Sequence, residues 1–168
     1  MLLFYPEIKK FNENIAKKIE KEIEKIENIN LNDIDFKTNR SIGENSSYIC
    51  SLIRGDEVVD FVKYHNHNNL NLNSKIQLSI FESNSLLLNK PPTLIEYSAF
   101  YGSLQIFQYL LQNNVQLTPS LGIYAIHGNN PEIIHLIEQD IGDNRIIPDD
   151  VSYLECFFES IKCHHNEI

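Results

Sequence analysis

The sequence predicts an all-α chain in which short antiparallel helix pairs repeat and stack as a solenoid. The strongest observation is internal repetition: TLIEYSAFYGSLQIFQYLLQNNVQL at residues 93–117 returns in degraded form as SLGIYAIHGNNPEIIHLIEQ at residues 120–139. The two blocks align at a constant offset of about 27 residues, within the range of stacked repeats. Helix-capping residues and apolar spacing at helical period support the same fold.

Two weaker copies extend the pattern. RGDEVVDFVKY matches the second half of the unit upstream, and the last residues of the chain match the beginning of another unit. We therefore expect repeats at 41–72 (degenerate), 91–117, 118–148 and 149–168 (incomplete), with a long connection at 72–90. Residues 1–40 are expected to form an N-terminal amphipathic helix and a connection.

The first helix of each unit has specific end signals. Thr93 and Glu96 have the spacing of a capping box, in which each side chain bonds to the backbone of the other residue. Gly102 is placed to end that helix in the left-handed conformation, and Asn129 takes the same place one unit later. This replacement preserves the helix end, which supports a repeated unit.

The second helices begin and end with equally clear signals. Residues 104–112 have apolar side chains at helical spacing, and Asn113 and Asn114 follow as a polar stop. In the next unit, Asn130 precedes Pro131 and Glu132, which is the order of a cap, a first-turn proline and an acid near the helix dipole. Each unit is therefore predicted to be a helix pair.

These residues carry a family resemblance. The block at 93–117 resembles the ankyrin repeat, with its pattern T-P-L-H-x-A-A-x-x-G-H-L-x-V-V-x-L-L-L-x-x-G-A-x-V, and more narrowly a group of protist ankyrin-like proteins of undefined function. The resemblance implies an ankyrin-like solenoid. The chain departs from the pattern at Leu94, Ile95 and Glu96, and its offset is shorter than the family's. Short or missing hairpins are therefore expected.

The N-terminal region contains a further periodic segment. Residues 6–27 predict one amphipathic helix, with apolar residues at three- and four-residue spacing: Ile8, Phe11, Ile15, Ile19, Ile23 and Ile26. Two interpretations stay open, a stripe that caps the first repeat and a coiled-coil seam for self-association. Residues 28–45 and the asparagine-rich run near Asn66 are expected to be polar connections.

Composition limits the function classes. A net charge of −9 argues against nucleic-acid binding, because phosphate contacts need clustered Lys and Arg. There is neither a signal-peptide pattern at the start nor an apolar run long enough for a membrane span. We expect an intracellular, cytoplasmic chain whose three cysteines are free thiols.

No motif predicts an enzyme, a cofactor or a metal. Cys156 and Cys163 share a helix face, with His164 and His165 next to them, but zinc sites favour four convergent ligands and closer cysteine spacing. A cysteine nucleophile paired with His127 or His135 has no supporting motif. The His65-x-His67 pair is expected in a loop without a metal.

With no motif for catalysis, a cofactor or a metal, the function that the sequence favours is binding of a partner protein. In ankyrin-like stacks the concave groove is lined by the ends of the first helices and by the hairpin tips, which implies an exposed partner-binding set: Phe100, Tyr101, His127, Gly128, Lys90, Gln116 and Lys162. For the adjacent aromatic residues Phe100 and Tyr101 a second interpretation stays open, in which they pack against the connection at 72–90. The sequence thus favours a protein-interaction module, a scaffold or adaptor for an unidentified protein. The alternative is a substrate-recruiting or regulatory arm of an enzyme assembly. Self-association through the N-terminal helix or the incomplete last repeat is also expected.

Overall fold

The structure is a computed structural model that describes residues 5–27, 34–79, 81–142, 146 and 150–163. These residues form eleven helices and no strand, apart from one isolated antiparallel bridge between Lys75 and Thr93. The predicted all-α class is confirmed.

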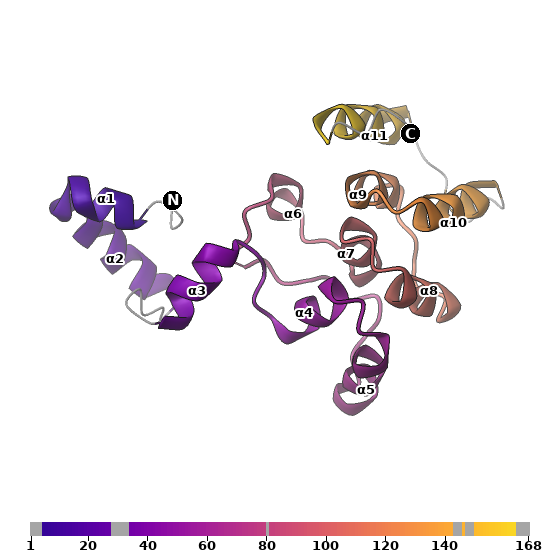
Figure 1. Cartoon of the computed structure of the whole chain (residues 1–168), viewed down its shortest axis with the longest axis horizontal. Helices are drawn as coiled ribbons and strands as arrows, with labels where there is room; N and C mark the ends of the chain where they lie inside the picture. The colour runs from indigo at the N-terminus through magenta and orange to yellow at the C-terminus, as the bar shows by residue number, and fades with distance from the viewer. Residues whose placement is uncertain (1–4, 28–33, 80, 143–145, 147–149, 164–168) are drawn as a thin grey trace. The chain divides into compact units, whose positions relative to one another are not determined.

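The chain divides into two compact units, Met1–Ser46 with Leu78–Lys90, and Ser47–Gln77 with Pro91–Ile168. The helices of the first unit are α1 (Tyr5–Phe11), α2 (Glu13–Glu27), α3 (Ile34–Ile42) and α6 (Ser85–Asn89). Those of the second unit are α4 (Tyr48–Arg54), α5 (Val58–Asn68), α7 (Leu94–Phe100), α8 (Leu104–Gln112), α9 (Leu121–Gly128), α10 (Pro131–Gly142) and α11 (Asp150–Lys162). Figure 1 labels all of them.

The expected single helix over residues 6–27 is wrong, because the chain bends at Asn12. The Asn12 side chain accepts a hydrogen bond from the backbone of Ile15 (3.1 Å), as an N-cap residue does for a new helix. Lys9 and Glu20 then approach to 3.4 Å across the two helices. In one straight helix those residues would lie about 16 Å apart along the axis. Helices α1 and α2 therefore form a hairpin.

Three expected connections are also partly helical. Residues 28–45 include α3, and residues 72–90 include α6. The asparagine-rich run is helical as far as Asn68, so His65 lies on α5 and not in a loop. Its ring nitrogen Nδ1 is 3.0 Å from the hydroxyl oxygen of Tyr109. Packing of α5 against α8 extends a helix that asparagine propensity alone disfavours.

In the second unit the helices pack as pairs, and the pairs stack. Helices α4 and α5, α7 and α8, and α9 and α10 form the pairs. Along the stack, α4, α7, α9 and α11 contact one another in succession, and α5, α8 and α10 form a second row (Figure 1). The core lies between these rows and includes Phe61, Tyr97, Phe107, Leu110, Tyr124 and Ile133, all at most 1% exposed.

The predicted helix caps are confirmed. Thr93 and Glu96 form both halves of the capping box on α7. Gly102 and Asn129 follow α7 and α9 in the left-handed conformation, with φ of 67° and 49°. Asn130 accepts a hydrogen bond from the backbone of Glu132 (3.0 Å) and so caps α10.

Glycine sets the distance between α7 and α9. A Cβ atom added at Gly128 would lie 2.1 Å from the carbonyl oxygen of Ala99. The two helices can approach this closely only because that side chain is missing. This contact fixes where the end of α9 meets α7, and it brings His127 beside Phe100.

Candidate functional site

The groove residues predicted on α7 are not freely exposed. Phe100 is only 6% exposed, and every residue of α7 is buried. The expectation of two exposed aromatic residues is therefore wrong for Phe100. The physical reason is that α7 packs against α4, α8 and α9, so it has no solvent face.

Tyr101 is half-buried within an aromatic group. Its ring lies 4.8 Å from the ring of Tyr97 and 4.9 Å from that of Phe100, and the guanidinium carbon of Arg54 lies 5.8 Å from its centre. Tyr101 is thus already engaged inside the stack.

The other predicted groove residues fall into two groups. His127 and Gly128 are half-buried on α9, and the His127 ring stacks on Phe100 with ring centres 4.0 Å apart and planes 9° apart. Gln116 and Lys162 are exposed in the same unit, whereas Lys90 is exposed in the first unit. The structure therefore brings His127 and Phe100 into contact, and Lys90 belongs to a different unit from the rest of the predicted set.

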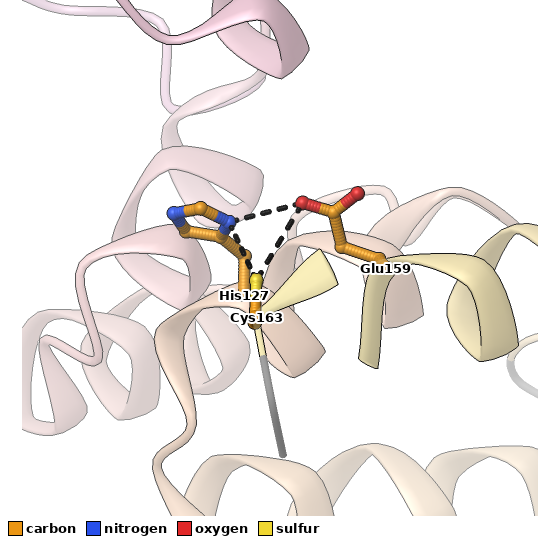
Figure 2. Close-up of side chains that lie close together, drawn as sticks. All are labelled: His127, Glu159 and Cys163. Atoms are coloured by element: carbon orange, nitrogen blue, oxygen red, sulfur yellow. Dashed lines mark hydrogen bonds and ion pairs between the residues drawn. The ribbon is translucent and has the colours of Figure 1, made fainter. Parts of the chain in front are cut away.

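A cluster that was not predicted forms where α9 meets α11 (Figure 2). His127 Nδ1 lies 3.1 Å from Glu159 Oε1 and 3.4 Å from Cys163 Sγ, and Cys163 Sγ lies 3.8 Å from Glu159 Oε1. A nitrogen, an oxygen and a sulfur atom thus face one another. We call these three residues the His–Glu–Cys cluster.

Helix geometry explains how the cluster arises. Cys163 directly follows the last residue of α11, and its backbone nitrogen donates to the Glu159 carbonyl oxygen (2.9 Å), so it continues the last turn and lies on the same face as Glu159. His127 is in the last turn of α9, which packs against α11. Cys156 lies nearer the start of α11, next to Gly122 on α9, so the two cysteines contact different parts of that helix.

The buried carboxylate dominates the electrostatics of the cluster. Burial alone would raise the pKa of Glu159, but hydrogen bonds from Lys162 and His127 outweigh burial and lower it. Burial and the neighbouring Glu159 charge raise the pKa of the Cys163 thiol. At neutral pH the cluster therefore contains a carboxylate and a protonated thiol.

These states bear on what the cluster can do chemically. A cysteine nucleophile needs a lowered pKa, which a neighbouring cation or helix N-terminus supplies. Cys163 has the opposite environment, so it is a poor candidate for an activated thiolate. Its approach to an imidazole and a carboxylate instead suits the binding of a cation that both groups can share.

The sequence did not single out Glu159. It paired a cysteine with His127 only as a nucleophile, and it grouped Cys163 with Cys156, His164 and His165 as metal ligands; the last two histidines lie outside the described residues. The available signal was the four-residue spacing of Glu159 and Cys163 on a predicted helix, together with the repeat alignment that places α11 after α9.

A second surface feature is the apolar side of α11. Five large side chains on one face are each 54% to 60% exposed: Tyr153, Leu154, Phe157, Phe158 and Ile161. The opposite face carries Cys156 and Glu159, with Cys163 one residue beyond the helix, and it packs on α9. The helix thus places its more polar side inward and its apolar side outward, the reverse of an ordinary surface helix.

Comparison with protein-family models, curated proteins and solved structures finds no significant match to this chain. The resemblance to ankyrin repeats therefore stays a prediction from the sequence. In the part of the chain that the structure describes, no helix has both the length and the apolar character needed to cross a membrane.

Proposed function

We propose that this chain is a protein-interaction module, a scaffold or adaptor of the ankyrin-like type, and that the outward apolar face of α11 is its main binding surface. The observation that carries the proposal is the exposure of five large apolar side chains on one helix. Contiguous apolar patches of this kind mark interaction sites. Phe157 and Phe158, with ring centres 5.9 Å apart, lie at the middle of the face.

The area of this face fits a protein partner. Large side chains bury about 150–250 Å² each, so five that are just over half exposed offer roughly 500 Å². A matching partner surface brings the buried total to about 1,000 Å², the lower limit of specific interfaces. The expected affinity is therefore moderate.

The position of α11 in the stack indicates what kind of partner it takes. Helices α7 and α9 each pack against a helix on either side in their row, whereas α11 packs mainly on α9. We expect the partner to contribute an amphipathic helix that continues the row. α11 carries Glu155 and Glu159 against Lys162, which disfavours an anionic membrane surface, since interfacial helices depend on Lys and Arg.

The exposed residues Gln116 and Lys162, from the set predicted by sequence, belong to the same unit as α11 and are proposed as peripheral contacts. Lys90 is exposed in the first unit and is proposed as a contact there. The buried residue Phe100 takes a supporting role, since it holds His127 against α11.

The test compares the full chain with two single variants of matched chemistry. Phe157→Glu places a charge in the α11 face, and Val59→Glu places the same charge at an exposed apolar residue of α5. Proteins captured from cells are purified and titrated against the three forms. We expect saturable binding that Phe157→Glu weakens at least tenfold, which is about 1.4 kcal/mol, and that Val59→Glu leaves unchanged.

Four outcomes would redirect or reject the proposal. Equal binding to all three forms, or no saturable partner, rejects the α11 face as a binding surface. Light scattering that shows a dimer of the wild type and a monomer of Phe157→Glu assigns the face to a second copy of the chain. A reproducible ligase or kinase among the partners would favour the recruiting arm of an enzyme assembly.

A further inference from the structure

The three donor atoms of the His–Glu–Cys cluster have the separations of ligands around one metal ion. Zn²⁺ bonds of about 2.0–2.3 Å to nitrogen, oxygen and sulfur in tetrahedral geometry place the donor atoms about 3.4–3.6 Å apart. The observed separations are 3.1 Å for nitrogen to oxygen, 3.4 Å for sulfur to nitrogen and 3.8 Å for sulfur to oxygen. Shifts of a few tenths of an ångström would therefore close the cluster around Zn²⁺.

The identity of the donors favours zinc over other common ions. Imidazole nitrogen, thiolate sulfur and carboxylate oxygen are the three ligand types of protein zinc sites. Calcium and magnesium select oxygen ligands, and the sulfur and nitrogen here do not suit them. The described residues contain no other group of three His, Cys, Asp or Glu side chains that converges in this way.

Neighbouring groups hold two of the donors in place. Lys162 Nζ donates to Glu159 Oε2 (2.9 Å), which leaves Oε1 directed toward His127 and Cys163. The Phe100 ring stacks on the imidazole of His127 and restrains its plane. Contacts of this kind to ligating carboxylates and histidines orient them in metal sites. The Glu159 side chain is 7% exposed and that of His127 is 25% exposed, so the donors are sheltered but still accessible.

We infer that His127, Glu159 and Cys163 bind Zn²⁺, with water in the fourth position, and that the ion fastens α11 to α9. Binding converts the Cys163 thiol to a thiolate, and its proton leaves to solvent. The ion would therefore hold α11, and with it the outward apolar face, at the end of the stack. This inference concerns a different face of α11 from the proposed protein surface and stands independently of it.

The experiment titrates the metal-free full chain with Co²⁺ and with Zn²⁺. Tetrahedral Co²⁺ bound to a thiolate gives charge-transfer and d–d absorption bands, which report both the sulfur ligand and the geometry. We expect one ion per chain, with the cobalt bands lost as Zn²⁺ displaces it. At a hundredfold excess of free Zn²⁺ over the dissociation constant, the melting temperature should rise by roughly 5–10 °C.

Matched variants identify the ligands. Cys163→Ser and Glu159→Gln keep the size of the side chain, and each should weaken Zn²⁺ binding at least tenfold, with loss of the charge-transfer band in Cys163→Ser. The controls are Cys156→Ser on the same helix and His135→Ala on α10, whose exposed imidazole bonds to Gln139 and lies outside the cluster. Both controls should bind as the wild type does.

Circular dichroism of each metal-free variant establishes that it is folded. His127→Ala removes the nitrogen ligand and should also weaken Zn²⁺ binding at least tenfold. If His127→Ala unfolds, His127→Gln, which keeps a polar planar side chain beside Phe100, repeats the test of the nitrogen ligand. Absence of saturable binding to the wild type would overturn the inference. So would binding that survives in Cys163→Ser with its charge-transfer band intact, or binding that is lost equally in Cys156→Ser.

Discussion

Glu96 is the buried charge whose removal tests the stacked arrangement most severely. Glu96 is only 1% exposed, and its two carboxylate oxygen atoms accept four hydrogen bonds. Oε2 accepts from the backbone nitrogen (2.7 Å) and the hydroxyl (3.0 Å) of Thr93 in its own unit. Oε1 accepts from the hydroxyls of Thr118 and Ser120, both at 2.6 Å, in the segment that leads into α9. One carboxylate thus joins two consecutive helix pairs of the stack, α7–α8 and α9–α10.

The loss of unfolding free energy expected in a Glu96 variant can be worked out from these four hydrogen bonds. A hydrogen bond to a charged group contributes about 1.5–3 kcal/mol, and each buried donor left without an acceptor costs about 1–3 kcal/mol. Because the four bonds share one acceptor group, their effects do not add in full. We expect Glu96→Ala to lower the free energy of unfolding by about 3–5 kcal/mol. Glu96→Gln, which keeps the shape but turns an amide donor toward other donors, should cost about 2–3 kcal/mol.

Urea unfolding followed by circular dichroism measures both variants. With a slope of about 1–3 kcal/mol per molar urea, the loss in Glu96→Gln should shift the midpoint by about 0.7–3 M at unchanged slope. Glu132→Gln is the control, since this acid is exposed in the first turn of α10, and it should change stability by less than about 0.5 kcal/mol. A Glu96→Gln variant as stable as this control would refute the claim that the carboxylate links the two helix pairs.

Three further predictions follow from the same packing. Burial would raise the pKa of Glu96, but its hydrogen bonds from Ser120, Thr118 and Thr93 lower it below the ordinary 4.5. The stabilising effect of the carboxylate is therefore complete above pH 4.5 and is lost as pH falls through the folded-state pKa. A urea midpoint measured against pH should show this loss in the wild type but not in Glu96→Gln. Gly128→Ala should destabilise the chain by more than about 2 kcal/mol, because its Cβ would collide with a backbone carbonyl, whereas Gly142→Ala, with nothing within 4 Å, should be neutral or gain up to about 1 kcal/mol in thermal unfolding. Asp56→Ala should cost about 1–2 kcal/mol, because both Asp56 oxygens accept from the first turn of α8 at 3.0 Å, and a loss below about 0.3 kcal/mol in urea unfolding would contradict that capping role.

The local signals in the sequence were sufficient to predict the helix ends of the stack. Thr93, Glu96, Gly102 and Asn129 act through their own backbone or that of residues within one turn, and such short-range chemistry can be read from spacing. The bend at Asn12 was missed because an asparagine inside an apolar period is compatible with both a continuous helix and a new N-cap. Periodicity alone does not distinguish the two.

Exposure and side-chain convergence could not be predicted in the same way. Phe100 is buried because α9 packs against it, and that contact depends on the missing side chain at Gly128, about a full unit away in sequence. The His–Glu–Cys cluster needs the register between α9 and α11, which apolar spacing does not specify. The polar inward face of α11 made that register harder to predict, since the helix appears reversed if burial is assigned from hydrophobicity.

The packing of α11 on α9 supports both the cluster and the outward apolar face, and one disulfide tests it directly. A Cβ atom at Gly122 would lie 3.1 Å from Cys156 Sγ, close to the separation of about 3.0 Å between a Cβ and the opposite sulfur in a disulfide. Under mild oxidation, Gly122→Cys should pair with Cys156, as detected by mass spectrometry of peptides, while a Gly142→Cys control should not. Failure of the Gly122→Cys chain to form this bond, or pairing with Cys163 instead, would contradict the arrangement of α9 and α11.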